Sequence, residues 1–160
     1  VQQLEMRAFR FLEMRIPPLV LLIFFGLLMW RIADGEVKPR DEIGVVLAPV
    51  LCLAGLAVCS SSVLAFHKHR TTVNPTKTAA VSSLVQTGIY QYTRNPMYLG
   101  FVLLLAAWAA WLGGGWPVWM LPVVYMAWLD LFQIRPEERF LKQRFLAEFV
   151  AYSAKVRRWL

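Results

Sequence analysis

Residues 95–129 decide the fold, and they read NPMYLGFVLLLAAWAAWLGGGWPVWMLPVVYMAWL. None of these 35 residues is charged. As one α-helix, rising about 1.5 Å per residue, the run would be far longer than the roughly 30 Å hydrocarbon core of a bilayer. Its middle, Gly113 to Pro117, reads Gly-Gly-Gly-Trp-Pro, which breaks a helix. We therefore predict a helical hairpin of two membrane spans, over 96–112 and 117–134.

Two further apolar runs precede this hairpin. Residues 43–66 contain 24 uncharged residues, and residues 16–30 contain 15. A span needs about 17–25 residues, so we extend the first one to 16–33, with Arg31 reaching toward the membrane surface. A chain with 58% hydrophobic and 17% charged residues is not an ordinary soluble domain. The prediction is an all-α integral membrane protein, a single domain over 1–160 with about four transmembrane helices.

The charges of the loops predict the orientation. Four spans place the N-terminus, the loop 67–94 and the C-terminal tail on one side, and these segments hold 14 of the 17 Lys and Arg residues. Basic residues favour the cytoplasmic side, so we expect both termini and the site there; for a bacterial protein the membrane would be the inner one. The net charge of +7 is then a topology signal, and no nucleic-acid partner is expected.

Both ends of the chain have amphipathic patterns. An N-terminal helix on the membrane surface would carry Leu4, Ala8, Phe11, Leu12 and Ile16. A C-terminal helix over about 136–154 would carry Phe140, Leu141, Phe145, Phe149 and Tyr152. We expect Cys52 and Cys59 to be buried as small apolar residues. His67 and His69 are two residues apart and do not share a helix face, so no metal site is expected.

Two predicted helix starts carry charged groups. Asn95 is a favourable N-cap and Pro96 a favourable first residue, and Arg94 precedes them, which suits an anionic ligand. Residues 135–138 read Arg-Pro-Glu-Glu, where Pro136 would open another helix and place two carboxylates in its first turn. The hairpin brings both starts to one side of the membrane. Together they suit a zwitterion such as the amino-acid end of a cofactor, although Glu137 and Glu138 could serve the helix dipole alone.

Other side chains nearby are candidates for the same site. Tyr90, Tyr92 and Tyr98 could stack on a base or face a cation. Asp130 is an acidic residue inside an apolar run, so it is either a functional group or a charge near the membrane surface. Nucleotide-binding and hydrolase motifs, such as G-x-G-x-x-G and G-x-S-x-G, do not occur, so no Rossmann-type cofactor domain is expected.

Three segments and a later run resemble a known superfamily. The segments are Thr72–Pro75 (TVNP), Leu84–Tyr90 (LVQTGIY) and Thr93–Gly100 (TRNPMYLG). The later run is Arg135–Glu138 (RPEE), followed in order by Phe145, Tyr152 and Val156. Together they resemble the isoprenylcysteine carboxyl methyltransferase and phospholipid methyltransferase superfamily of integral membrane enzymes, over about half of the chain.

The resemblance implies S-adenosylmethionine as the methyl donor, bound at the cytoplasmic ends of the spans and covered by the C-terminal helix. By position, the cofactor site would be formed by Gly88, Tyr90, Arg94, Asn95, Pro96, Tyr98, Leu99, Gly100, Glu137 and Glu138. Catalytic roles fall on Arg94, Glu138 and Lys155. The acceptor would be a lipophilic small molecule or lipid with a carboxylate, thiol or amine, entering from the membrane between spans that Trp108, Met126 and Trp128 could line.

The chain departs from the isoprenylcysteine branch at four positions. Where that branch has His, Arg, Gly and Tyr, this chain has Asn95, Lys155, Leu146 and Phe149 respectively. Lys keeps the charge of Arg but not its two-pronged hydrogen bonding, which argues against a prenylcysteine carboxylate as acceptor. Two other functions remain open: a membrane reductase of the sterol-reductase type using NADPH, and a non-catalytic four-helix membrane protein. The oligomeric state is not predicted.

Overall fold

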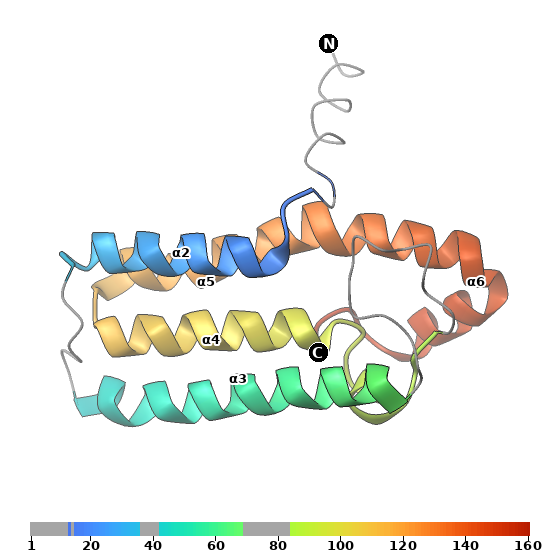
Figure 1. The fold of residues 1–160 in the computed structure, drawn as a ribbon, viewed down its shortest axis with the longest axis horizontal. Helices are drawn as coiled ribbons and strands as arrows, with labels where there is room; N and C mark the ends of the chain where they lie inside the picture. Colours follow the sequence, from blue (N-terminus) through green and yellow to red (C-terminus); the bar gives the residue numbers. More distant parts are fainter. Residues whose placement is uncertain (1–12, 14, 36–41, 69–83) are drawn as a thin grey trace, which may run out of the picture.

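The structure, a computed structural model, describes residues 13, 15–35, 42–68 and 84–160. Every regular element in these ranges is helical (Figure 1). The TVNP motif at 72–75, His69, and most of the expected N-terminal helix lie outside the described residues. The predicted all-α fold class is confirmed.

Four apolar helices lie side by side along the length of the molecule (Figure 1). They are α2 (Pro18–Ile32), α3 (Glu42–Lys68), α4 (Pro96–Leu112) and α5 (Gly115–Leu129). A short 3-10 helix, η2 (Gly88–Gln91), precedes α4. A π-helical turn, η3 (Asp130–Ile134), joins α5 to the last helix, α6 (Arg135–Lys155). The start of α4 and the end of α5 consequently lie at one end of the bundle, beside α6.

The helices have the apolar surfaces of a membrane protein. Within the described ranges, α3 and the continuous run Gly115–Lys155 are long and apolar enough to cross a bilayer, whereas α2 and α4 have 15 and 17 residues. Large apolar side chains on the outside of α2 and α3 are exposed, among them Ile23, Phe24, Val46, Leu53 and Leu64. Apolar surface of this extent suits lipid rather than water. The chain is an integral membrane protein.

The predicted hairpin is confirmed at the turn between α4 and α5. Gly113 ends α4 in the left-handed conformation, with φ of 61°, and its N–H donates to Ala109 O. Gly115 also has a positive φ, of 70°. A Cβ atom on Gly114 would collide with the Val118 side chain. The three consecutive glycines therefore allow a turn too tight for residues with side chains.

The core lies between α2, α4 and α5. Phe25 of α2 packs edge-on against Tyr125 of α5, with ring centroids 5.4 Å apart. The other buried members of this core are Leu21, Met29, Ala33, Tyr98, Leu105, Ala109, Leu112, Val118, Leu129 and Ile134. On its other side, α4 packs closely on α3, where Gly100 faces Gly55 and Cys59. Small residues at such a contact let two helix backbones approach each other.

The junction of α5 and α6 corrects one prediction. We expected Pro136 to open a new helix, but the helix continues through the π turn, in which Arg135 N–H donates to Asp130 O five residues earlier. The wider turn accommodates Pro136, which lacks an N–H, without a break. Glu137 and Glu138 are consequently not at a free helix N-terminus, and serving the helix dipole no longer accounts for them.

A sharp bend divides α6, which was predicted as a single helix over about 136–154. Leu146 has φ of 38° and ψ of −112°, outside the helical region. The residues after it fold back beside the first half of α6 (Figure 1). This return buries Phe149 and Tyr152, and the Tyr152 hydroxyl donates a 2.7 Å hydrogen bond to Tyr90 O. The bend therefore closes the end of the bundle where α4 begins.

Candidate active site

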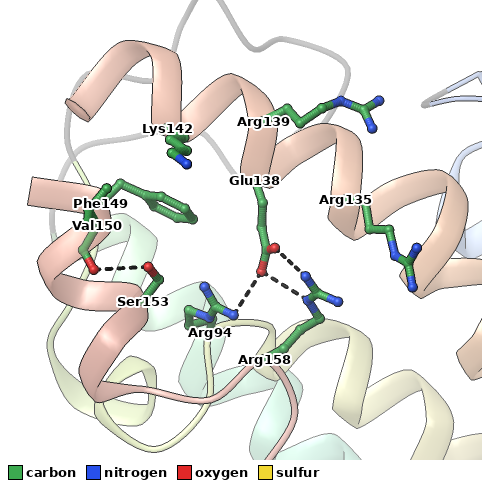
Figure 2. Close-up of a pocket in the computed structure, with 9 residues that line it drawn as sticks. All are labelled: Arg94, Arg135, Glu138, Arg139, Lys142, Phe149, Val150, Ser153 and Arg158. Atoms are coloured by element: carbon green, nitrogen blue, oxygen red, sulfur yellow. Dashed lines mark hydrogen bonds and ion pairs between the residues drawn. The ribbon is translucent and has the colours of Figure 1, made fainter. Parts of the chain in front are cut away.

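A pocket of about 390 Å³ lies at this end of the molecule, between the two halves of α6, Arg94 and Arg158 (Figure 2). Its volume falls within the range of about 300–1,000 Å³ that is typical of small-molecule sites. Its charged lining combines one carboxylate with several cations. The lining residues are Arg94, Arg135, Glu138, Arg139, Lys142, Phe149, Val150, Ser153 and Arg158.

Arg94 and Glu138 meet in this pocket, as the hairpin topology predicts. Arg94 Nη2 lies 3.2 Å from Glu138 Oε1, and both side chains are largely buried, at 14% and 17% exposure. Arg94 precedes the start of α4, and Glu138 lies in the first turn of α6. The two residues are 44 positions apart in the chain and meet because α4 and α5 form an antiparallel pair. Arg135 and Arg139 point away from Glu138 (Figure 2).

Arg94 retains unused hydrogen-bonding capacity. Its buried Nε has no partner among the described residues. Its guanidinium carbon lies 5.9 Å from the centroid of the buried Phe149 ring, within the range of a cation–π contact. A buried donor without a partner is costly, so this Nε is suited to an anionic ligand atom entering the pocket.

The C-terminal segment 156–160 contacts the start of α4. Arg94 N–H donates to Arg157 O, over 3.0 Å. The Asn95 side chain does not cap α4 as predicted; its Nδ2 donates instead to Arg158 O, over 3.0 Å. The Thr93 hydroxyl donates to the same oxygen, over 3.2 Å. Pro96 is the first residue of α4, as predicted, and is buried.

Arg158 is the central residue of the pocket's ion pairs. Its Nη2 lies 2.6 Å from Glu138 Oε2 and its Nε 3.1 Å from Glu138 Oε1. Its Nη1 lies 3.0 Å from Asp130 Oδ1. The Glu138 contact raises the pKa of Arg158. Asp130 also accepts a hydrogen bond from Arg135 Nε, over 2.9 Å, so two arginines contact its carboxylate. Asp130 itself does not line the pocket.

Glu137 belongs to a separate buried polar cluster. The Tyr98 hydroxyl donates to Glu137 Oε1, over 2.5 Å. Burial raises the pKa of Glu137 to about 7, although the bond from Tyr98 opposes that rise. Beside it, the hydroxyls of Tyr90 and Ser62 are 2.8 Å apart, and burial raises the pKa of Tyr90. Glu137, Tyr90 and Tyr98 do not line the pocket.

The other predicted site residues have varied surroundings. Gly88 begins η2 with a positive φ of 64°, and Leu99 is partly buried. Gly100 packs against α3, and Tyr92 is 74% exposed. Lys155 is exposed and does not line the pocket.

Residues expected in the membrane also have identifiable partners. Trp108 Nε1 donates to Gly26 O over 3.0 Å, and the Trp128 ring packs on Phe132, with centroids 4.5 Å apart. Cys52 and Cys59 are partly buried free thiols. Within the ranges that the structure covers, no group of three His, Cys, Asp or Glu residues could hold a metal ion.

Sequence reasoning did not identify Arg158 or Ser153 as pocket residues. Both follow the bend at Leu146, and their position depends on the return of the chain toward α4 (Figure 2). The dipeptide Arg157-Arg158 reads as an ordinary basic tail. Phe149 was noted as a departure from the isoprenylcysteine branch, and the structure places it in the pocket wall.

Comparisons with known proteins give the family. The family model described as phospholipid methyltransferase matches residues 43–148, from α3 to just beyond the bend in α6. An uncharacterized protein of Haemophilus influenzae is 41% identical over 64 residues, which cover 40% of this chain and all of that protein. No solved structure matches significantly. Because the family match covers well over half of the residues, the chain belongs to the phospholipid methyltransferase family.

Proposed function

We propose that this protein transfers a methyl group from S-adenosylmethionine to a lipophilic acceptor at the cytoplasmic face of the membrane. Family membership supports methyl transfer to a lipophilic substrate. The observation that carries the choice of cofactor is the pairing of Arg94 and Glu138 in one pocket. A cation beside an anion suits the carboxylate and ammonium groups at the amino-acid end of the cofactor.

The residues present fit that cofactor. The unpartnered Nε of Arg94 is suited to the carboxylate of the amino-acid end. Glu138 is the acidic residue of the lining and suits the ammonium group. Phe149 and Val150 supply an apolar wall for the uncharged remainder of the molecule. The sequence offered Glu137 and Glu138 as partners for the ammonium group. We assign it to Glu138, because Glu137 accepts a hydrogen bond from Tyr98.

The chemistry asks little of the protein beyond binding and orientation. S-adenosylmethionine supplies a methyl group that its positive sulfonium already activates. Arg94 and Glu138 would fix one end of the cofactor, and the return of α6 would shield the pocket from water, so that an acceptor can be aligned for direct attack. A carboxylate or thiolate acceptor needs no strong base, whereas an amine must first lose a proton.

The charge distribution supports the cytoplasmic side. Among the described residues, the α6 end of the bundle carries Arg15, Lys68, Arg94 and the basic residues of α6 and the tail, whereas the opposite end carries Arg31. This is the asymmetry expected when the α6 end is cytoplasmic. Cysteines introduced at Trp116, which is 77% exposed beside the turn, and at Ser153 in intact cells should react with an impermeant reagent only at position 116. Reaction of Ser153 alone would reverse the orientation.

The acceptor is proposed to reach the site from the bilayer, between helices whose outer faces are apolar. Lys155 is exposed and outside the pocket lining, which favours an acceptor other than a prenylcysteine carboxylate. Methylation of a farnesylcysteine analogue by the wild-type protein, abolished in Lys155→Ala, would contradict this choice.

Ligand binding separates this proposal from the two other functions. The protein purified in detergent should bind S-adenosylhomocysteine, the demethylated product, and should not bind NADPH. Transfer of a labelled methyl group into the apolar products of a lipid extract would then identify the acceptor class. Binding of NADPH alone would favour a reductase, and binding of neither ligand would favour a non-catalytic membrane protein.

A further inference from the structure

Arg158 occupies both oxygens of the Glu138 carboxylate. Nη2 and Nε lie 2.6 and 3.1 Å from the two oxygens, which is the two-pronged geometry of a strong ion pair. Arg94 Nη2 shares one of those oxygens, at 3.2 Å. Two guanidinium groups therefore surround the carboxylate that the proposed function assigns to the cofactor's ammonium group (Figure 2).

Arg158 has a second carboxylate within reach. Nη1 lies 3.0 Å from Asp130 Oδ1, so one guanidinium bridges Glu138 and Asp130. Asp130 is 19% exposed on its side chain and keeps Arg135 as its other partner. If Arg158 gives up Glu138, it retains an anionic partner, and its charge does not become unpaired in a partly buried place.

The backbone of this segment is fixed independently of the Arg158 side chain. Arg158 O accepts hydrogen bonds from the side chains of Thr93 and Asn95, and Arg157 O accepts from Arg94 N–H. These three bonds hold the tail on the start of α4. The Arg158 side chain, 31% exposed, can therefore change partner while the tail stays in place.

We propose that Arg158 is a positioning residue that pairs with Glu138 when no cofactor is bound and passes to Asp130 when the cofactor binds. The inference rests on the proposed function, because it requires the cofactor's amino-acid end at Glu138. Arg94 and Arg158 already contact the two oxygens of Glu138, so an ammonium group would be a third cation on one carboxylate and would compete with Arg158 for it. On product release Arg158 returns to Glu138, which keeps that carboxylate paired throughout the cycle.

The test is the direction in which affinity changes in two variants. Calorimetric titration with S-adenosylhomocysteine in detergent should give a dissociation constant about threefold to tenfold lower for Arg158→Gln, because the competitor is lost. Asp130→Asn should raise the constant by about threefold, because Arg158 then stays on Glu138. In the double variant with Arg158→Gln, Asp130→Asn should not change the dissociation constant further, since Arg158, through which Asp130 acts, is absent.

Two controls isolate the proposed exchange. Arg157→Ala removes the same charge from the neighbouring residue, whose side chain is exposed and outside the pocket lining, and should leave affinity unchanged. 5′-Methylthioadenosine lacks the amino-acid end, so its affinity should be the same in Arg158→Gln and in the wild type. Melting curves in detergent accompany every titration.

Each result decides the inference. Weaker binding in Arg158→Gln would show that Arg158 holds the cofactor's carboxylate, and unchanged binding would show no competition; either result overturns the proposal while leaving the cofactor in place. If Arg158→Gln does not fold, unchanged affinity in Asp130→Asn overturns it instead. If the wild-type protein binds no S-adenosylhomocysteine, the proposed function itself is wrong. That outcome is distinct from failure of the inference about Arg158.

Discussion

The Tyr98 hydroxyl donates a 2.5 Å hydrogen bond to Glu137 Oε1, and this contact ties the first turn of α4 to the first turn of α6. Tyr98 is buried, at 7% exposure, and neither Tyr98 nor Glu137 lines the pocket. It explains why adjacent glutamates have different surroundings: Glu137 faces Tyr98, whereas Glu138 faces the arginines.

Tyr98→Phe should destabilise the protein. The substitution keeps the ring in the core but leaves a partly buried carboxylate without its donor. A hydrogen bond to a charged group contributes about 1.5–3 kcal/mol. Thermal unfolding in detergent should show a lower melting temperature, whereas Tyr92→Phe, at an exposed position, should melt like the wild type. Equal melting of both variants would contradict a structural role for this bond.

Glu137 should make stability depend on pH. Burial raises its pKa from 4.5 to about 7, so between these values the folded protein holds a proton that the unfolded chain has lost. The contribution of Glu137 to folding stability is therefore fully present below about pH 4.5 and is lost as pH rises through about 7. Between pH 5 and 8 the wild type should melt at falling temperatures, and Glu137→Gln should flatten this decline. A parallel decline in both proteins would assign the effect to other groups.

Gly100 was placed in the cofactor site by resemblance, whereas the structure packs it against α3. A Cβ atom there would lie 2.9 Å from Gly55 O and would collide with Cys59 Sγ. Gly100→Ala should cost about 1–3 kcal/mol of stability through overpacking. Gly26→Ala is the matched control, since no atom lies within 4 Å of its added methyl group and the change should be neutral or stabilising. Loss of S-adenosylhomocysteine affinity without loss of stability in Gly100→Ala would instead support the predicted cofactor role of Gly100.

The parts of the fold that follow from local sequence were predictable. Run lengths and the glycines at 113–115 predicted the hairpin, and the hairpin in turn predicted that Arg94 and Glu138 meet. The continuation of the helix through Pro136 was not predictable, because helix rules assume hydrogen bonds four residues apart and the π turn uses five. A proline at that position was therefore interpreted as a new helix start.

The cationic side of the pocket depends on long-range structure. Arg158 reaches Glu138 only because the chain reverses at Leu146, and leucine is a strong helix former with no tendency to mark a bend. The bend is stabilised elsewhere, by the burial of Phe149 and Tyr152 against the start of α4. Tertiary packing thus decides the backbone at Leu146, and no local pattern indicates it.

Leu146→Gly should stabilise the protein. Leu146 has a positive φ, and its side chain is 69% exposed. Glycine at this position would therefore remove the backbone strain and lose little side-chain packing. Backbone conformations of this kind cost a residue with a side chain about 1–3 kcal/mol, and we expect a net gain of about 1 kcal/mol. Ala151→Gly, at an exposed helical position five residues later, should lose about 1 kcal/mol instead. Melting temperatures that move in opposite directions confirm the bend.

Arg94→Ala and Glu138→Gln should weaken cofactor binding. Each removes one of the two opposite charges assigned to the cofactor's amino-acid end. A hydrogen bond to a charged group contributes about 1.5–3 kcal/mol, which corresponds to roughly tenfold to a hundredfold in the dissociation constant for S-adenosylhomocysteine. Glu138→Gln is the sharper variant, because it keeps the size of the side chain and removes only its charge.

Charge-matched controls are available on the outside of α6. Arg144→Ala and Glu148→Gln make the same changes at exposed positions that do not line the pocket, and both should bind S-adenosylhomocysteine like the wild type. If Arg94 and Glu138 formed only a structural ion pair, their variants would melt earlier but would keep the wild-type affinity. Unchanged affinity in both would remove the zwitterion site, and the assignment to S-adenosylmethionine would then rest on family membership alone.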